Sequence, residues 1–256
     1  MRSKRLAPIL TTIFALTLST LQSEAAPGFG PGSSSSSASK DGASSKSVSV
    51  WTFSQHSQSN GEITVQICPQ AVKLKMSNQP FSIVSAAPDW KVYAYNRSKG
   101  TYREWPKNGY RGLQKDMLFD AWMRDHQWIK VGEVNSKVPG LRLESLKIKE
   151  KADLGLAEKT AIIGVTKAVS ISPEALKVYS STLKVPYFGK FPMEARIGKT
   201  LFGLSSSQYL STSRGKIERV ELSSFALPKG LKKVSDENRI TEDGSSEGFV
   251  DLIPSN

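Results

Sequence analysis

Few residues of this sequence could carry catalysis, and their spacing does not favour it. The chain contains one cysteine, Cys68, and two histidines, His56 and His126. A cysteine nucleophile needs a paired imidazole, and a protein zinc site needs several thiolate or imidazole ligands together. The serine run FGLSSSQ lacks the G-x-S-x-G pattern of a nucleophile turn, and Asp125 and His126 would diverge as neighbours on a helix. We therefore expect no enzyme, with no catalytic residue, no metal site and no cofactor.

Aromatic residues concentrate between Phe81 and Pro106, in FSIVSAAPDWKVYAYNRSKGTYREWP, which contains two Trp, three Tyr and one Phe. Read as strands, this stretch places bulky groups on both faces of a sheet, as expected for a sheet curved around a cavity. Core packing and cross-strand pairing explain the same rings without a ligand. The candidate ligand-binding residues are Trp90, Tyr93, Tyr95, Trp105, Met117 and Trp122. The candidate contacts for an anionic head are Arg103, Arg111 and Arg124.

The first 25 residues have the pattern of a secretory signal peptide. Met1–Arg5 is basic, Leu6–Leu21 is apolar but interrupted by Thr and Ser, and Ser23–Ala25 offers small residues at a cleavage site after Ala25. The apolar run is shorter than the roughly 20 residues that a membrane-spanning helix needs. We therefore expect a periplasmic or secreted protein that does not span a membrane after cleavage.

Composition divides the rest of the chain into three parts. Residues 26–47 are rich in Gly and Ser and are predicted to be a disordered linker, whereas residues 241–256 form an acidic, flexible tail. Between them, residues 48–240 are predicted to be a single mainly-β domain. This body contains 30 Lys and Arg against 17 Asp and Glu, a net charge of +13. Such an excess favours anionic envelope surfaces as partners, and nucleic acid is not expected for an exported protein.

Period-two alternation predicts strands along most of the body. They are predicted in SVWTFSQHS, EITVQIC, AVKLKMS, FSIVSAA, KVYAYNR, TYREWP, QWIKVGEV, LRLESLKIK, TAIIGVTKAVSIS, ALKVYSSTLKV, YLSTS and KIERVEL. Apolar residues at helical spacing predict one amphipathic helix over Asn108–Gln127, which must cover the sheet. Ser172 and Pro173 could also begin a helix, but the β-branched and aromatic residues of ALKVYSSTLKV favour a strand. Cys68 is out of phase with the apolar residues of EITVQIC and is expected to be partly exposed.

A resemblance follows from this order of elements. The short antiparallel strands behind a signal peptide, the single helix midway, the AIIGVTKAVSIS strand and the ending FALPKGLKKVSDENRI resemble the outer-membrane lipoprotein carrier superfamily. The resemblance implies a curved antiparallel sheet, or half barrel, covered by one or two helices and enclosing an apolar cavity for acyl chains. Here a Ser-rich linker leads directly into SVWTFSQ where that family begins with a helix. The family's lid-locking arginine has no assignable counterpart, so no functional residue is carried over.

Two functions are consistent with these observations. The first is an exported, non-enzymatic binding or carrier protein that takes an apolar or amphipathic ligand, a lipid or lipoprotein acyl chain, in a half-barrel cavity. In this hypothesis Asn108–Gln127 is a lid, with Met117 and Trp122 against the ligand. The alternative is a basic envelope interaction protein that binds polyanionic surface polymers and has no ligand cavity. The two differ in salt response, because exposed charges are screened by salt and a buried acyl chain is not.

Overall fold

A computed structural model describes residues 47–113, 126–149, 161–197 and 207–241 of the chain. The predicted signal peptide and nearly all of the predicted linker and acidic tail lie outside these residues. The central part of the predicted lid, with Met117, Trp122 and Arg124, also lies outside them. No helix within the described ranges is long and apolar enough to cross a membrane.

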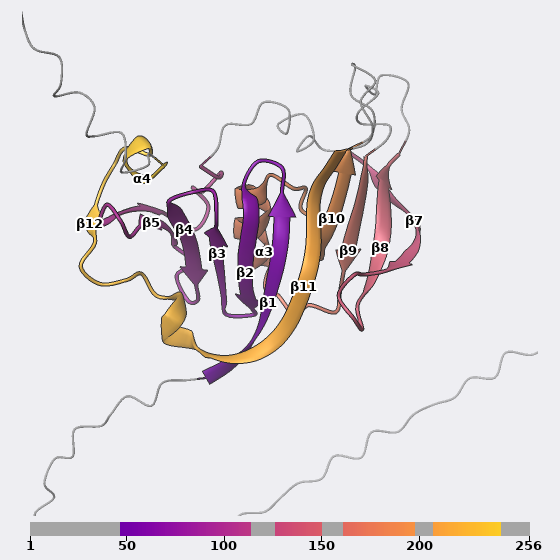
Figure 1. Cartoon of the computed structure of the whole chain (residues 1–256), viewed down its shortest axis with the longest axis horizontal. Helices are drawn as coiled ribbons and strands as arrows, with labels where there is room; N and C mark the ends of the chain where they lie inside the picture. The colour runs from indigo at the N-terminus through magenta and orange to yellow at the C-terminus, as the bar shows by residue number, and fades with distance from the viewer. Residues whose placement is uncertain (1–46, 114–125, 150–160, 198–206, 242–256) are drawn as a thin grey trace, which may run out of the picture. The chain divides into compact units, whose positions relative to one another are not determined.

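Twelve strands of the described chain form one sheet, which is not closed into a barrel (Figure 1). The spatial order is β12-β6-β5-β4-β3-β2-β1-β11-β10-β9-β8-β7, and every neighbouring pair is antiparallel except β12 and β6. The strands are β1 (Ser47–Ser57), β2 (Gly61–Cys68), β3 (Ala71–Met76), β4 (Phe81–Ala86), β5 (Val92–Asn96), β6 (Thr101–Trp105), β7 (Trp128–Asn135), β8 (Arg142–Ile148), β9 (Ile162–Thr166), β10 (Phe191–Ile197), β11 (Ser207–Glu221) and β12 (Lys232–Lys233). The mainly-β, half-barrel fold class predicted from the sequence is therefore confirmed.

The alternation of apolar and polar residues sets the faces of the first strands. In β3, Val72, Leu74 and Met76 are buried, whereas Lys73 is half-buried and Lys75 is exposed. Successive side chains of a strand point to opposite faces, so one face of β3 contributes to the core and the other carries lysines. At the tip of the β5–β6 hairpin Gly100 has a φ of +63°, as its place in the sequence predicts.

One helix, α3 (Pro173–Leu183), packs against the inner face of the sheet, behind β1, β2 and β3 in the view of Figure 1. Its Tyr179 ring lies 4.8 Å from Phe191 of β10, and Phe191 in turn lies 5.0 Å from Phe53 of β1, measured between ring centroids. All three side chains are fully buried. The inner face of the described sheet is therefore covered by a helix and packed side chains.

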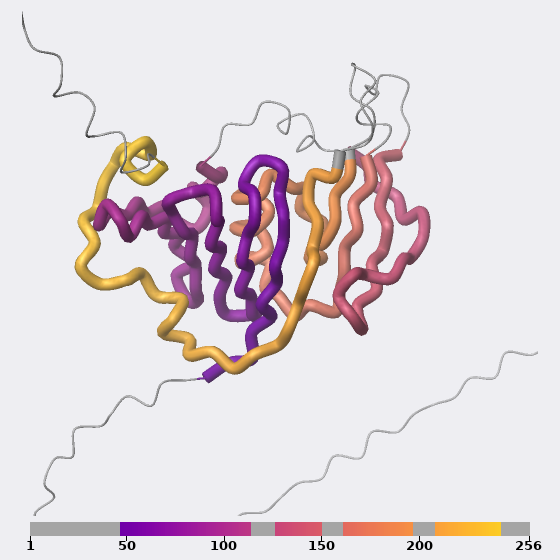
Figure 2. The backbone as a smooth tube through the Cα atoms, viewed as in Figure 1, coloured from indigo at the N-terminus to yellow at the C-terminus, as the bar shows by residue number. Residues whose placement is uncertain are grey.

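The outer face has a smaller apolar cluster of its own. After β11 the chain forms a short 3-10 helix, η1 (Leu222–Phe225), and then runs across to β12 and the short helix α4 (Asn238–Thr241), as the tube in Figure 2 shows. Phe225 packs with Cys68, Val84 and Tyr95. Cys68 is consequently buried, so the expectation of a partly exposed thiol was wrong. The phase of β2 was correct, but a segment more than 150 residues later covers that face.

The segment ALKVYSSTLKV belongs to α3, so the prediction of a strand there was wrong. The Ser172 hydroxyl accepts a hydrogen bond from the backbone N–H of Ala175 at 3.1 Å, and Pro173 occupies the first turn. Lys184 ends the helix in the left-handed conformation. The capping residues and the burial of Tyr179 against the sheet outweigh the strand preference of individual residues, because β propensity depends on context.

Three further features differ from the prediction. YLSTS and all but the last residue of KIERVEL belong to one strand, β11, whose Gly215 pairs with Phe53 of β1 and leaves space for its ring, since a Cβ there would lie 2.6 Å from that ring. β10 was not predicted, since Pro192 interrupts its alternation and the register shifts between Pro192 and Glu194. The predicted helix over Asn108–Gln127 does not include its first six residues or its last two, which are turn or irregular.

Candidate functional site

Three buried tyrosine hydroxyls fix α3 in place. Tyr179 donates to Oε1 of Gln55 at 2.8 Å, and Tyr209 donates to the carbonyl oxygen of Leu183 at 2.8 Å. The Tyr110 hydroxyl lies 3.0 Å from Oγ1 of Thr182. Burial raises the pKa of both Tyr179 and Tyr110 well above the usual tyrosine value, because the charged form would lose its hydration. The hydroxyls of Tyr179 and Tyr110 therefore remain protonated, and the three tyrosines together hold α3 to the sheet and to the chain that follows β6.

A pocket of about 460 Å³, here called the α3 pocket, lies between α3 and the chain that follows β6. It is lined by Lys107, Asn108, Tyr110, Arg111, Lys177, Val178, Ser180, Ser181 and Tyr187. Its volume falls in the range of about 300 to 1,000 Å³ that is usual for small-molecule sites. Gly112 permits the close approach of the two segments, since it has a φ of +88° and a Cβ there would lie 2.3 Å from the carbonyl oxygen of Ser181.

Positive charge exceeds negative charge around the α3 pocket. Glu174 pairs with Lys107 at 3.0 Å, and this hydrogen bond lowers the pKa of the Glu174 carboxyl below its usual range. The Lys184 ammonium donates to the carbonyl oxygen of Arg111 at 2.7 Å. The Arg111 guanidinium itself has no ion-pair or hydrogen-bond partner among the described residues, and Lys177 is exposed beside it. Among the described residues, neither of these two cations has an ion pair or hydrogen bond, although the charge of Lys177 also lowers the pKa of Glu174.

The lining of the α3 pocket also includes Ser180, which has a buried hydroxyl. The Ser180 side chain is 2% exposed, and its Oγ has no hydrogen-bond partner within the described ranges. A buried hydroxyl without a partner is costly, typically by about 1 to 3 kcal/mol.

The predicted ligand-binding rings do not gather at one place. Trp90 and Trp105 are in the main core, 7% and 8% exposed, and Trp105 contacts the Tyr110 ring at 5.3 Å. Tyr95 and Tyr93 belong to the cluster on the outer face. Of the predicted rings that the structure describes, only Trp105 is connected to the α3 pocket, through Tyr110, which the sequence analysis did not single out.

The predicted arginines Arg103 and Arg111 also lie at different places in the structure. Arg103 pairs with Glu237 at 3.0 Å and lies 4.8 Å from the centre of the Trp105 ring, so its charge is already engaged. Of the two predicted arginines that the structure describes, Arg111 lines the α3 pocket. Lys177, which lines the same pocket, lies in α3, 66 positions later in the chain. The sequence analysis predicted a strand there and therefore did not place Lys177 near Arg111.

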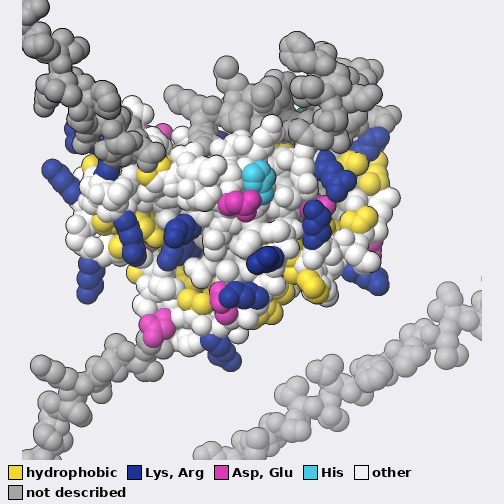
Figure 3. Space-filling model, in the orientation of Figure 1, with side chains coloured by type: hydrophobic (Ala, Val, Ile, Leu, Met, Phe, Trp, Pro, Cys, Tyr) yellow, Lys and Arg dark blue, Asp and Glu magenta, His cyan; other side chains and the backbone are white. Residues whose placement is uncertain are grey.

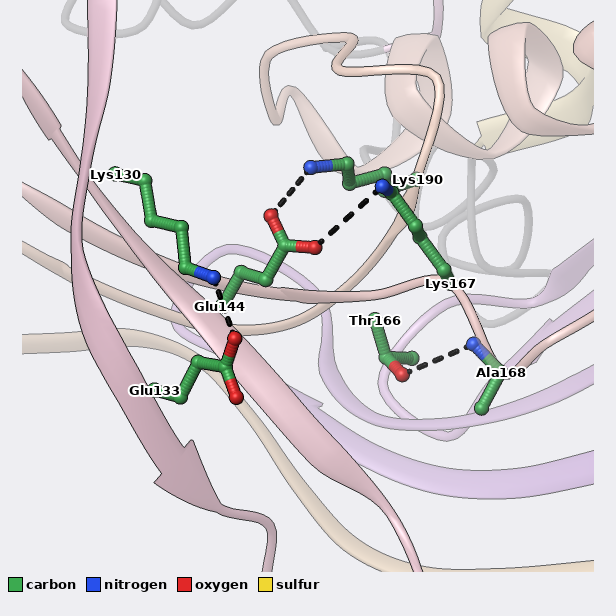
Figure 4. Close-up of polar contacts among 7 residues, drawn as sticks. All are labelled: Lys130, Glu133, Glu144, Thr166, Lys167, Ala168 and Lys190. Carbon is green, nitrogen blue, oxygen red and sulfur yellow. Dashed lines mark hydrogen bonds and ion pairs between the residues drawn. The ribbon is translucent and has the colours of Figure 1, made fainter. Parts of the chain in front are cut away.

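A second charged cluster lies where β7, β8 and the end of β9 meet, beside a pocket of about 340 Å³ (Figure 4). Glu144 bonds to Lys190 and lies 3.8 Å from Lys167, while Lys130 bonds to Glu133. The hydrogen bond from Lys190 lowers the pKa of the Glu144 carboxyl. Most charges here are paired, so we interpret this cluster as a network that joins the strands.

The described residues include few side chains that are placed for catalysis. They contain no group of three His, Cys, Asp or Glu side chains that could hold a metal ion. His56 pairs with Glu62 at 3.1 Å on an exposed part of β1 and β2, whereas Cys68 is buried in the cluster on the outer face. The α3 pocket has the chemistry of a binding site, with cations, a hydroxyl and apolar walls.

Comparison with known proteins adds little. No family model matches the chain, and no curated protein matches it. Among solved structures, the chain is similar to an uncharacterized conserved protein from Thermus thermophilus, with a TM-score of 0.41 and 11% sequence identity, over 75% of this chain and 91% of that one. At this level the similarity has no bearing on function.

Proposed function

We propose that this protein is an exported, non-enzymatic binding or carrier protein for an amphipathic anion, whose anionic head binds in the α3 pocket. The observation that carries the proposal is the convergence of Arg111, Lys177 and the Ser180 hydroxyl on one pocket. The neighbouring carboxylate, Glu174, is already bonded to Lys107. An arriving carboxylate or phosphate would thus meet the cations of Arg111 and Lys177.

We assign the apolar part of the ligand to the walls of the α3 pocket. Val178 and Tyr110 line it from the core side, and Tyr187, which is 44% exposed, lines it from the solvent side. Exposed rings beside a cationic site suit a molecule with one apolar and one charged end. Met117 and Trp122 remain predicted ligand contacts, and Arg124 a predicted head contact.

The experiment is a titration of the purified exported protein with a fluorescent fatty acid and with its methyl ester, which lacks the charge. We expect the acid to bind at least tenfold more tightly than the ester. Hydrogen bonds to charged groups contribute about 1.5 to 3 kcal/mol each, and 1.4 kcal/mol corresponds to about tenfold in affinity. The double variant Arg111→Gln with Lys177→Gln should lose this preference.

The matched control is the double variant Lys137→Gln with Lys229→Gln, which removes two exposed cations outside the pocket. It should bind the acid as the wild type does, including at high salt. Absence of fatty-acid binding in the wild type would refute the carrier function. Equal loss of binding in both double variants, together with steep salt dependence, would favour the alternative of a protein that binds polyanionic surfaces.

A further inference from the structure

The outer face of the sheet carries a second group of cations. A groove of about 290 Å³, here called the outer groove, is lined by Lys73, Lys75, Met76, Gln79, Pro80, Phe81, Ser82, Tyr95 and Arg97. α3 lies behind the sheet in Figure 1, so the space-filling view of Figure 3 looks onto this outer face, where Lys and Arg side chains are spread with few Asp or Glu among them. The outer groove and the α3 pocket share no lining residue.

Strand register aligns the polar groups of the outer groove. Lys75 of β3 pairs with Ser82 of β4, and Ser82 pairs with Tyr95 of β5. Directly paired residues share a face of the sheet, so these three form one row across three strands. Lys73 precedes Lys75 by two residues in β3, which places it on the same face beside the row, and Arg97, in the turn after β5, lines the same groove.

Among the residues that the structure describes, no carboxylate lines the outer groove. Lys75 and Arg97 are exposed, and neither has an ion-pair partner among the described residues. Lys73 donates to the backbone carbonyl oxygen of Ser224 at 3.1 Å, which leaves its charge uncompensated. The hydroxyls of Ser82 and Tyr95 make no hydrogen bond to another described residue.

The three cations repel one another. Burial lowers the pKa of Lys73 below its usual value, and the charges of Arg97 and Lys75 lower it further. Where no carboxylate compensates a group of like charges, the binding of an anion reduces the repulsion between them. Three cations and two hydroxyls supply more donors than a carboxylate can accept, whereas a phosphate group has several acceptor oxygens and up to two charges.

We propose that the outer groove is a binding site for a phosphate group, held by Lys73, Lys75 and Arg97 with the hydroxyls of Ser82 and Tyr95. The groove is open and small in volume, so the phosphate can be carried by a larger molecule. This inference does not depend on the proposed function, because the α3 pocket is formed by other residues.

The test measures binding of two probes to the full exported chain. The first is inorganic phosphate, titrated by calorimetry against a sodium chloride background of constant ionic strength. The second is vesicles of phosphatidylcholine with phosphatidic acid, assayed by cosedimentation. The variant is Lys75→Gln with Arg97→Gln, whose exposed side chains are not needed for folding, and the control is Lys137→Gln with Lys229→Gln.

We expect the wild type and the control to bind phosphate within about twofold of each other, and the groove variant to bind it at least tenfold more weakly. Vesicle binding that the groove variant loses would assign the phosphate to a lipid headgroup. Phosphate binding without vesicle binding would assign it to a soluble phosphate ester, and both results support the site. Failure of the wild type to bind either probe, or an equal loss in both variants, would overturn the proposal.

Discussion

Replacement of Tyr179 by phenylalanine tests whether α3 is fixed to the sheet. The Tyr179 hydroxyl donates to Gln55 Oε1 at 2.8 Å and lies 3.1 Å from the carbonyl oxygen of Pro192. Gln55 is fully buried and donates through its own amide to Thr212 Oγ1 at 2.9 Å. Tyr179→Phe therefore leaves Gln55 Oε1 buried without a donor. An unpaired buried group costs about 1 to 3 kcal/mol, so we expect the free energy of unfolding to fall by about 2 kcal/mol.

Urea unfolding followed by tryptophan fluorescence measures this change. The midpoint should fall while the slope with urea concentration stays constant, because the folded and unfolded surfaces are unaltered. For a domain of this size each 1 kcal/mol lowers the melting temperature by about 2 to 4 °C, so Tyr179→Phe should lower it by about 4 to 8 °C.

The control is Tyr187→Phe, because Tyr187 is 44% exposed and makes no hydrogen bond within the described residues. It should change the free energy of unfolding by less than about 0.5 kcal/mol. If Tyr179→Phe also changed it by less than about 0.5 kcal/mol, the hydroxyl network would not hold α3, and the assignment of the α3 pocket to a fixed helix would fail.

Two further predictions concern the helix cap and the response to pH. Ser172→Ala should lower the free energy of unfolding by about 1 kcal/mol in urea unfolding, because the backbone N–H of Ala175 loses its acceptor, whereas Ser172→Asp should retain most of it. For Glu144, a folded-state pKa below the unfolded value of 4.5 means that its contribution to stability is present above that pH and is lost on acidification. Stability curves from about pH 7 to about pH 3 should therefore fall less for Glu144→Gln than for the wild type, and parallel curves would contradict the role of Lys190.

Local sequence was sufficient for much of the sheet. Alternation located the first six strands, and the hairpin before Thr101 was predicted because Gly100 readily adopts a positive φ. The face of each residue in β3 also followed from its phase. Period two reports which side chains lie on the same face, since successive residues of a strand point in opposite directions.

Predictions from local sequence were wrong where a segment distant in the chain determines burial or secondary structure. Cys68 is buried in a cluster on the outer face that includes Phe225, and the Phe53 ring of β1 occupies the space that a side chain at Gly215 of β11 would fill. The ALKVYSSTLKV segment contains strand-favouring residues, yet its caps and the inner face of the sheet make it a helix. Intrinsic preferences amount to fractions of a kcal/mol per residue, whereas burial of one large side chain contributes about 1.5 to 3 kcal/mol.

The sequence by itself determined the charge of the body, the scarcity of catalytic residue types and the phase of most strands. Tertiary structure alone decided which charges meet. Arg111 lies beside Lys177 because α3 packs against the chain that follows β6, and Lys75, Ser82 and Tyr95 form a row because three strands pair in one register. Composition counts charges and alternation assigns them to a face, but neither specifies the long-range pairing that places residues tens of positions apart in the lining of one pocket.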